Sequence, residues 1–175
     1  MKKTVMVLAL ASTLVLGACA KTVTRDEWVN KIKECEKADI SSAKSIDVKG
    51  YAFESGKKQA YELTWTNGSD SLENLKNLAV ITTLVATFNT AFGLAAADAA
   101  EAIKPGVVKY SIGSGDSFLI LNFDVSETKD GTTTKSKGEF KYSNKAALPT
   151  YIYLDTNTGS SESSGESKLT FTYKW

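Results

Sequence analysis

The sequence predicts an α+β fold, in which one curved antiparallel sheet of about seven strands is covered on its inner face by helices. Seven short segments alternate apolar and polar residues, as strands do when one face of a sheet is buried and the other is solvated. Residues 78–97, between the second and third of these segments, contain no charged residue. This stretch predicts a long apolar helix that packs on the inner face of the sheet.

An N-terminal helix is predicted to begin near Thr24 and to continue to about Ile40. Thr24 is followed three residues later by Glu27, the pattern of a capping box, in which each side chain bonds the backbone N–H of the other. Trp28, Ile32 and Cys35 follow at helical spacing. They therefore predict one buried stripe, in which Cys35 is a small apolar residue rather than a reactive thiol.

Two strands are predicted next, over residues 44–54 and 57–66. In the first strand, Ile46 and Val48 share one phase of the alternation, whereas Tyr51 and Phe53 share the other. The phase changes at Gly50, which predicts a bulge or bend at that residue.

The long apolar helix is predicted over residues 71–103, with a capping box formed by Asp70 and Glu73. A straight helix from Asp70 to Ile103 would measure about 51 Å, but a compact domain of this size is only about 40 Å across. We therefore expect a kink or break between Asn89 and Gly93. Pro105 and Gly106 mark the end of the helix.

The C-terminal part of the chain predicts five strands: residues 107–112, 117–127, 132–142, 151–154 and 168–175. Asp130-Gly131 lies between two alternating runs, which is the strongest short-range signal of a β-hairpin. A two-residue loop fixes the register, and the predicted pairs are Lys129–Thr132, Val125–Ser136, Phe123–Gly138, Leu121–Phe140, Leu119–Tyr142, Asp124–Lys137 and Ser126–Lys135. One face of this hairpin is then largely apolar, and the other carries complementary charges. Residues 156–167 predict a polar loop.

The first nineteen residues predict a membrane anchor. Lys2 and Lys3 precede a short apolar run that ends in Leu16-Gly17-Ala18-Cys19, a pattern that resembles the signal peptide and lipobox of bacterial lipoproteins. The resemblance implies that residues 1–18 are removed and that Cys19 becomes the acylated N-terminus. Residues 19–24 would then be a short tether, and residues 25–175 one α+β domain.

The resemblance also implies a place for the protein, in the cell envelope and attached to a membrane through Cys19. Stable attachment needs two or more acyl chains, which the lipoprotein family supplies. Ala20 follows Cys19, and no aspartate stands there to retain the protein at the inner membrane. An outer-membrane location is therefore favoured if the cell is Gram-negative.

The composition excludes several classes of function. The chain has no histidine, which excludes Ser-His-Asp and Cys-His catalysis and histidine-ligated metal sites. Without residues 1–18 the net charge is about −1, and no basic excess indicates nucleic acid. We therefore expect a non-enzymatic protein with no catalytic residues, no metal and no cofactor.

Two classes of function remain. In the first, the protein binds an apolar ligand or lipid in a cavity larger than about 300 Å³ between helix and sheet. The candidate ligand-binding residues are the aromatic side chains of the inward faces: Tyr61, Trp65, Phe123, Phe140, Phe171 and Tyr173. In the second, these side chains fill the core, and the protein is a structural or partner-binding lipoprotein whose protein partner is unknown.

Three interpretations of residues 78–97 accompany these classes. The stretch is a helix buried on the sheet, a helix that covers a cavity, or a segment that inserts in a membrane. The helix that contains this stretch begins amphipathically, with Leu72, Leu75 and Leu78 against Glu73, Lys76 and Asn77. This favours packing on a core over insertion.

Overall fold

The computed structural model describes residues 20–35, 39–54, 56–113, 118–129, 131–143, 146–157 and 164–175. Its centre is one antiparallel sheet with the strand order β1-β4-β5-β6-β7-β8-β2-β3, which does not close on itself. The strands are β1 (Lys21–Val23), β2 (Ser45–Glu54), β3 (Lys57–Thr66), β4 (Lys109–Ile112), β5 (Phe118–Lys129), β6 (Thr132–Ser143), β7 (Pro149–Asn157) and β8 (Gly165–Lys174). The fold is therefore α+β, as predicted.

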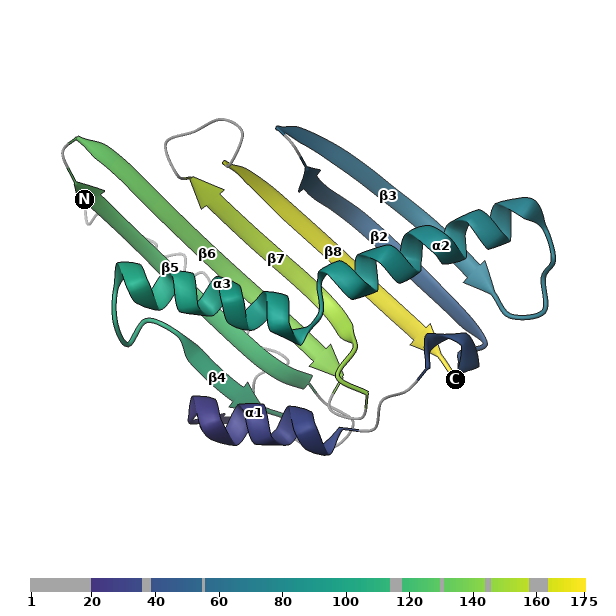
Figure 1. Ribbon diagram of the computed structural model, residues 1–175, viewed down its shortest axis with the longest axis horizontal. Helices are drawn as coiled ribbons and strands as arrows, with labels where there is room; N and C mark the ends of the chain where they lie inside the picture. Colours follow the sequence, from purple (N-terminus) through teal and green to yellow (C-terminus); the bar gives the residue numbers. More distant parts are fainter. Residues whose placement is uncertain are drawn as a thin grey trace, which may run out of the picture.

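The helices lie together on one face of the sheet (Figure 1). They are α1 (Arg25–Glu34), the short 3₁₀ helix η1 (Ile40–Ser42), α2 (Leu72–Thr87) and α3 (Thr90–Ile103). Helix α2 packs mainly on β3, α3 packs on β5 and β6, and α1 packs on β4. The core lies between this layer and the sheet, and its largest fully buried side chains include Trp28, Phe140 and Tyr142.

The long helix is broken, as its length predicted, and the break lies at Asn89, the first residue of the predicted segment. Phe88 ends α2, and Asn89 begins α3 with an extended backbone. The Asn89 side chain accepts a hydrogen bond from the Phe92 backbone N–H at 3.0 Å, which satisfies one of the free donors at the start of a helix. The two helices therefore form one bent ridge across the sheet.

The β5–β6 hairpin has the predicted register throughout, from Lys129 opposite Thr132 to Leu119 opposite Tyr142. On the outer face, Lys137 Nζ lies 2.8 Å from Asp124 Oδ2. The capping box of Thr24 and Glu27 is also confirmed. Local chemistry thus determines both features, because each depends on residues close together in the chain.

The number of strands is eight rather than about seven. Strand β1 lies within the segment predicted as a tether, and its three residues pair with Tyr110–Ile112 of β4. A three-residue strand shows too little alternation for detection in a sequence, and here its backbone partner defines it. Strands β7 and β8 also extend into the predicted polar loop, to Asn157 and from Gly165.

Helix α1 ends at Glu34, so the prediction that it reaches Ile40 is wrong. Cys35 already has an extended backbone. Further on, the Asp39 side chain accepts a hydrogen bond from the Ser41 N–H at 2.9 Å and starts η1. Helix α2 begins one residue later than predicted, because Ser71 rather than Asp70 caps it, accepting from the Asn74 N–H.

The predicted bulge at Gly50 is also wrong. Strand β2 pairs with β3 and β8 without a shift of register, so Tyr51 and Phe53 lie on the outer face. A Cβ at Gly50 would collide with the Lys168 carbonyl of β8, and its φ is +133°. Glycine is therefore needed for close approach of two backbones. The shift that the sheet does have falls between Lys141 and Tyr142, where β6 pairs with β7.

Candidate functional site

The six aromatic residues predicted to bind a ligand all belong to the inner face of the sheet. Trp65, Phe123, Phe140 and Phe171 are buried, and Tyr61 and Tyr173 are half-buried. They come from β3, β5, β6 and β8 and belong to one core cluster with the apolar side chains of the helices. The structure therefore brings them to one layer, where they pack against protein atoms.

The contacts of these six residues are those of a packed core. The ring centroids of Phe123 and Phe140 are 6.1 Å apart, and those of Phe140 and Phe92 are 6.0 Å apart. Such tilted and edge-on arrangements are favourable for aromatic pairs. The hydroxyl of Tyr173 donates to the Pro149 carbonyl at 3.0 Å, and the hydroxyl of Tyr61 donates to Glu54 at 2.9 Å.

Large side chains outside the predicted set also belong to the core. Trp28 lies against Tyr110 and Tyr142, with ring centroids 5.7 and 6.1 Å away. The Tyr142 hydroxyl donates to the Asn89 carbonyl at 3.0 Å, and burial raises the pKa of Tyr142 well above its usual range. The helical stripe that contains Trp28 indicated its burial, but no local signal indicated its partners.

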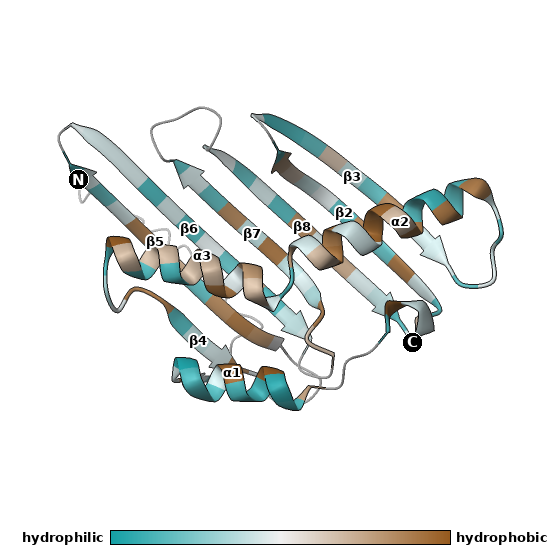
Figure 2. Ribbon diagram, viewed as in Figure 1, coloured by the Kyte–Doolittle hydropathy of each residue, from teal (hydrophilic) through white to brown (hydrophobic). Residues whose placement is uncertain are grey.

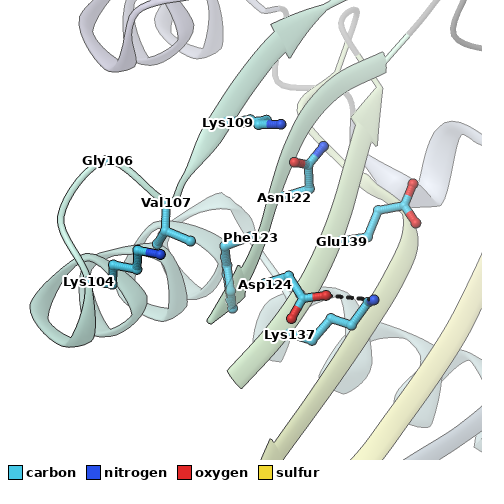
Figure 3. Close-up of a pocket in the computed structure, with 10 residues that line it drawn as sticks. Lys104, Gly106, Val107, Lys109, Asn122, Phe123, Asp124, Lys137 and Glu139 are labelled. Atoms are coloured by element: carbon cyan, nitrogen blue, oxygen red, sulfur yellow. Dashed lines mark hydrogen bonds and ion pairs between the residues drawn. The ribbon is translucent and has the colours of Figure 1, made fainter. Parts of the chain in front are cut away.

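A hollow of about 590 Å³ lies beside the first residue of β4, Lys109, where β5 continues past Asn122 without β4 as a neighbour. Its charged lining residues are Lys104, Lys109, Asp124, Lys137 and Glu139, and Phe123 is the one member of the predicted six among its walls. Figure 3 shows Lys104 and Val107 on one side of the hollow and the Asp124–Lys137 ion pair on the other. Its charged rim does not suit an apolar ligand.

The second hollow, about 400 Å³, lies at the opposite edge of the sheet, between β3 and the start of α2. Only polar side chains line it, and Glu62 and Glu73 are its charged members. Asn74 separates this hollow from the core: its side chain bonds both the N–H and the carbonyl of Thr66, at 2.8 and 3.0 Å. Both hollows therefore open at the margins of the sheet.

Several apolar side chains of α2 are exposed on its outward side. Leu72 is 68% and Leu75 53% exposed, and Figure 2 shows α2 and α3 mostly in brown and pale tones. By length and composition, Leu72–Ile103 is apolar enough to cross a membrane, and 28% of its most apolar stretch is buried. The sequence pattern indicated burial of this helix, and the structure places only one side of it against the sheet.

The described residues hold no candidate metal site, and the cysteine among them is buried. Within the described ranges, no three side chains of cysteine, aspartate or glutamate gather as a metal site would require. The Cys35 thiol donates to the Lys31 carbonyl at 3.2 Å, and burial raises the pKa of this thiol. Cys19, the predicted lipidation site, lies outside the described residues.

Comparison of the chain with models of protein families, with curated proteins and with solved structures found no match.

Proposed function

We propose that this protein is a lipid-anchored, non-enzymatic envelope protein that acts through its surface, as a structural or partner-binding domain. The observation that carries the proposal is the burial of large aromatic side chains between helices and sheet. Trp28, Phe140 and Tyr142 are fully buried there, and both hollows lie at the sheet margins, with charged side chains in their linings. A carrier of apolar ligands needs an apolar cavity in that place.

The lipid anchor in this proposal rests on the resemblance of Leu16-Gly17-Ala18-Cys19 to a lipobox. Strand β1 begins at Lys21, only two residues after Cys19, and two extended residues span about 7 Å. An acylated Cys19 would therefore hold the β1 edge of the sheet at the membrane surface. The outer membrane is the favoured location if the cell is Gram-negative.

The anchor is tested by labelling cells with a palmitate analogue. The full chain should incorporate the label and fractionate with membranes, and Cys19→Ala should abolish both. Labelling of the Cys19→Ala variant, or a wild-type chain released in soluble form, would contradict the anchor.

The filled core is tested by native mass spectrometry of Lys21–Trp175, combined with lipid extraction. We expect a clean apo mass that incubation with phospholipid vesicles leaves unchanged. A co-purifying lipid near one-to-one stoichiometry would overturn the proposal and favour a carrier.

The exposed side of α2 supports the carrier as a second candidate. Among the residues of α2, only Asn74, Ile81 and Leu84 are buried, so outward movement of this helix would uncover few side chains. An apolar ligand would then contact Tyr61, Trp65, Phe171 and Tyr173 beneath it. Replacement of Trp65 by alanine should weaken lipid retention in the same mass measurement, whereas a filled core predicts no lipid in either protein.

A further inference from the structure

Strand β3 forms one edge of the sheet, and part of its backbone faces no other strand. Glu54 and Lys57 are the last pair of the β2–β3 ladder. In an antiparallel ladder, alternate residues direct both N–H and C=O towards the neighbour. The backbone groups that point to β2 are therefore those of Lys57, Gln59, Tyr61 and Leu63. The residues between them direct their backbone groups out of the sheet.

Two asparagines of α2 confirm this alternation and cover one end of the edge. Asn74 bonds the N–H and the carbonyl of Thr66, and Asn77 donates to the Thr64 carbonyl at 2.9 Å. The remaining free stretch is Lys57–Leu63. The Ala60 carbonyl receives a long contact of 3.4 Å from the Gln59 side chain, and the described residues provide no other partner for the outward backbone groups of Lys58, Ala60 and Glu62.

The side chains of this free stretch are self-complementary. Ala60 is its midpoint, is exposed and is small. If a second copy of β3 paired antiparallel about Ala60, Lys58 of each copy would lie opposite Glu62 of the other. Both side chains are on the outer face and exposed, Glu62 to 83%. Opposite charges directly across an antiparallel pair are stabilising.

We propose that two copies of this chain associate through β3, antiparallel about Ala60, into one continuous sheet. Every outward N–H of Lys58, Ala60 and Glu62 in one copy then meets a carbonyl of the other, as in β-strand addition. The arrangement is twofold and closed, and it keeps the helices of both copies on the same side. The proposal goes beyond the proposed function and does not depend on it.

The hollow beside the edge adds to the charge complementarity. It contains Glu62 and Glu73 but no lysine or arginine. In this register, Lys57 of the second copy arrives opposite Leu63, next to that acidic hollow. The interactions that Lys58 and Glu62 already have are surface contacts, since Lys58 Nζ lies over the Tyr51 ring and Glu62 pairs with Lys49 at 3.3 Å. Such contacts are weak, so they do not prevent Lys58 and Glu62 from pairing across the two copies.

Lysines at a sheet edge also serve in many proteins to keep strands of other copies away. A lysine opposes such pairing when the pairing would place it against another positive charge or against a surface from which water is excluded. Pairing about Ala60 places each Lys58 against a glutamate instead. If Lys58 keeps other copies away, Lys58→Glu should favour association of two copies. If Lys58 pairs with Glu62 of the other copy, the same variant should weaken association.

The test is the dissociation constant of the full chain in density-matched detergent, measured by sedimentation equilibrium. Lys58→Glu and Glu62→Lys should each weaken the dimer about tenfold, because each replaces two attractive pairs by two repulsive ones. The double variant Lys58→Glu/Glu62→Lys restores opposite charges and should return to within about threefold of the wild type. Thermal unfolding of each variant verifies that it is folded.

A cysteine at the twofold axis gives a second measurement that does not depend on charge. Residues opposite each other in a hydrogen-bonded pair have Cα atoms about 5.5 Å apart, within the range for a disulfide. In a Cys35→Ala background, Ala60→Cys should form disulfide dimers in the purified full chain under mild oxidation. Matched exposed positions are Ser126→Cys on the free part of β5 and Thr172→Cys in mid-sheet, and these should not form them.

A wild-type chain that stays monomeric at all concentrations would overturn the proposal. So would equal cross-linking at Ala60 and Ser126, or a double charge reversal no better than the single ones.

Discussion

The two halves of the bent helix are held to the sheet in different ways. Helix α3 packs closely on the sheet. Its buried residues Gly93, Ala97 and Ala100 are small and let its backbone approach β5 and β6. Helix α2 is held by two buried apolar side chains, Ile81 and Leu84, and by hydrogen bonds at its first turn. Its Leu72 and Leu75 remain exposed.

This difference indicates that the stability of the ridge is uneven. A region with few buried apolar contacts opens locally at lower free energy than a closely packed one. We therefore expect α3 to exchange its amide hydrogens only on global unfolding, and α2 to exchange by local opening. Any partner or ligand that needs movement of the structure would act on α2.

The largest effect is expected for Phe140→Ala beneath α3. Phe140 is fully buried between Phe92 and Phe123, so its removal leaves a cavity in the tightest part of the core. The free energy of unfolding, measured by urea denaturation, should fall by about 3–5 kcal/mol. Leu75→Ala on the exposed side of α2 is the control, with a change within about 0.5 kcal/mol. Similar losses in both variants would remove the contrast between the two halves.

The second effect is expected for Gly93→Ala in α3. Helix propensity alone would make this variant more stable by about 1 kcal/mol. A Cβ at Gly93, however, would collide with the Tyr142 hydroxyl and lie 3.3 Å from Cζ of its ring. Tyr142 is fully buried and cannot move away freely, so we expect a net loss of about 1–2 kcal/mol.

A double-mutant cycle with Tyr142→Phe sharpens this test, because that variant removes the atom nearest to the new Cβ. Gly93→Ala should then cost less in the Tyr142→Phe background than in the wild type. A gain of stability from Gly93→Ala alone would mean that α3 does not press on β6 at this point.

An intermediate effect is expected for Asn74→Ala in α2. Its side chain makes bonds to the Thr66 N–H, the Thr66 carbonyl and the Ser69 carbonyl, the last at 2.8 Å. The variant should lose about 1–3 kcal/mol, since it leaves part-buried backbone groups unpaired. Hydrogen exchange should show faster exchange at Thr66 and in the first turns of α2, with α3 unchanged.

Asn77→Ala is the matched control for Asn74→Ala, because this side chain donates one exposed bond, to the Thr64 carbonyl. Its effect should stay within about 0.5 kcal/mol. Faster exchange in α3 after Asn74→Ala would show that the two helices open together.

The features that the sequence predicted correctly depend on neighbouring residues. Asp130-Gly131 fixed the register of the β5–β6 hairpin, and the capping box of Thr24 and Glu27 marked the start of α1. The predicted inward aromatics also lie on the inner face of the sheet. In each case a local rule of turn, cap or alternation was sufficient.

The features that were missed depend on residues far apart in the chain. The outward direction of Tyr51 and Phe53 follows from Gly50 lying against the Lys168 carbonyl and from Gly165 beneath the Phe53 ring. Strand β1 exists because β4 pairs with it. The hollows and the covered end of the β3 edge likewise depend on which helices and strands pack together. Local residue patterns do not predict that packing.

The smallest effect is expected for Glu101→Gln, which tests the far end of α3. Glu101 accepts hydrogen bonds from the N–H groups of Gly106 and Val108, at 2.7 and 2.9 Å. The bond with Val108, followed by that with Gly106, lowers the pKa of Glu101 below its usual value of 4.5. A lowered pKa in the folded state means stabilisation that is complete above pH 4.5 and is lost as the pH falls through the lower, folded-state value.

At neutral pH, therefore, the urea midpoint of Glu101→Gln should lie below that of the wild type, and the gap should close in acid as the wild-type carboxyl becomes protonated. Glu27→Gln at the start of α1 should behave in the same direction, because the Thr24 N–H lowers the pKa of Glu27. The start of α2 is held by the neutral amide of Asn74, so Asn74→Ala should show a gap that does not change with pH. The difference in urea midpoint from the wild type could instead close in acid for Asn74→Ala, or stay constant for Glu101→Gln. Either result would mean that the two ends of the ridge are not held by groups that differ in charge.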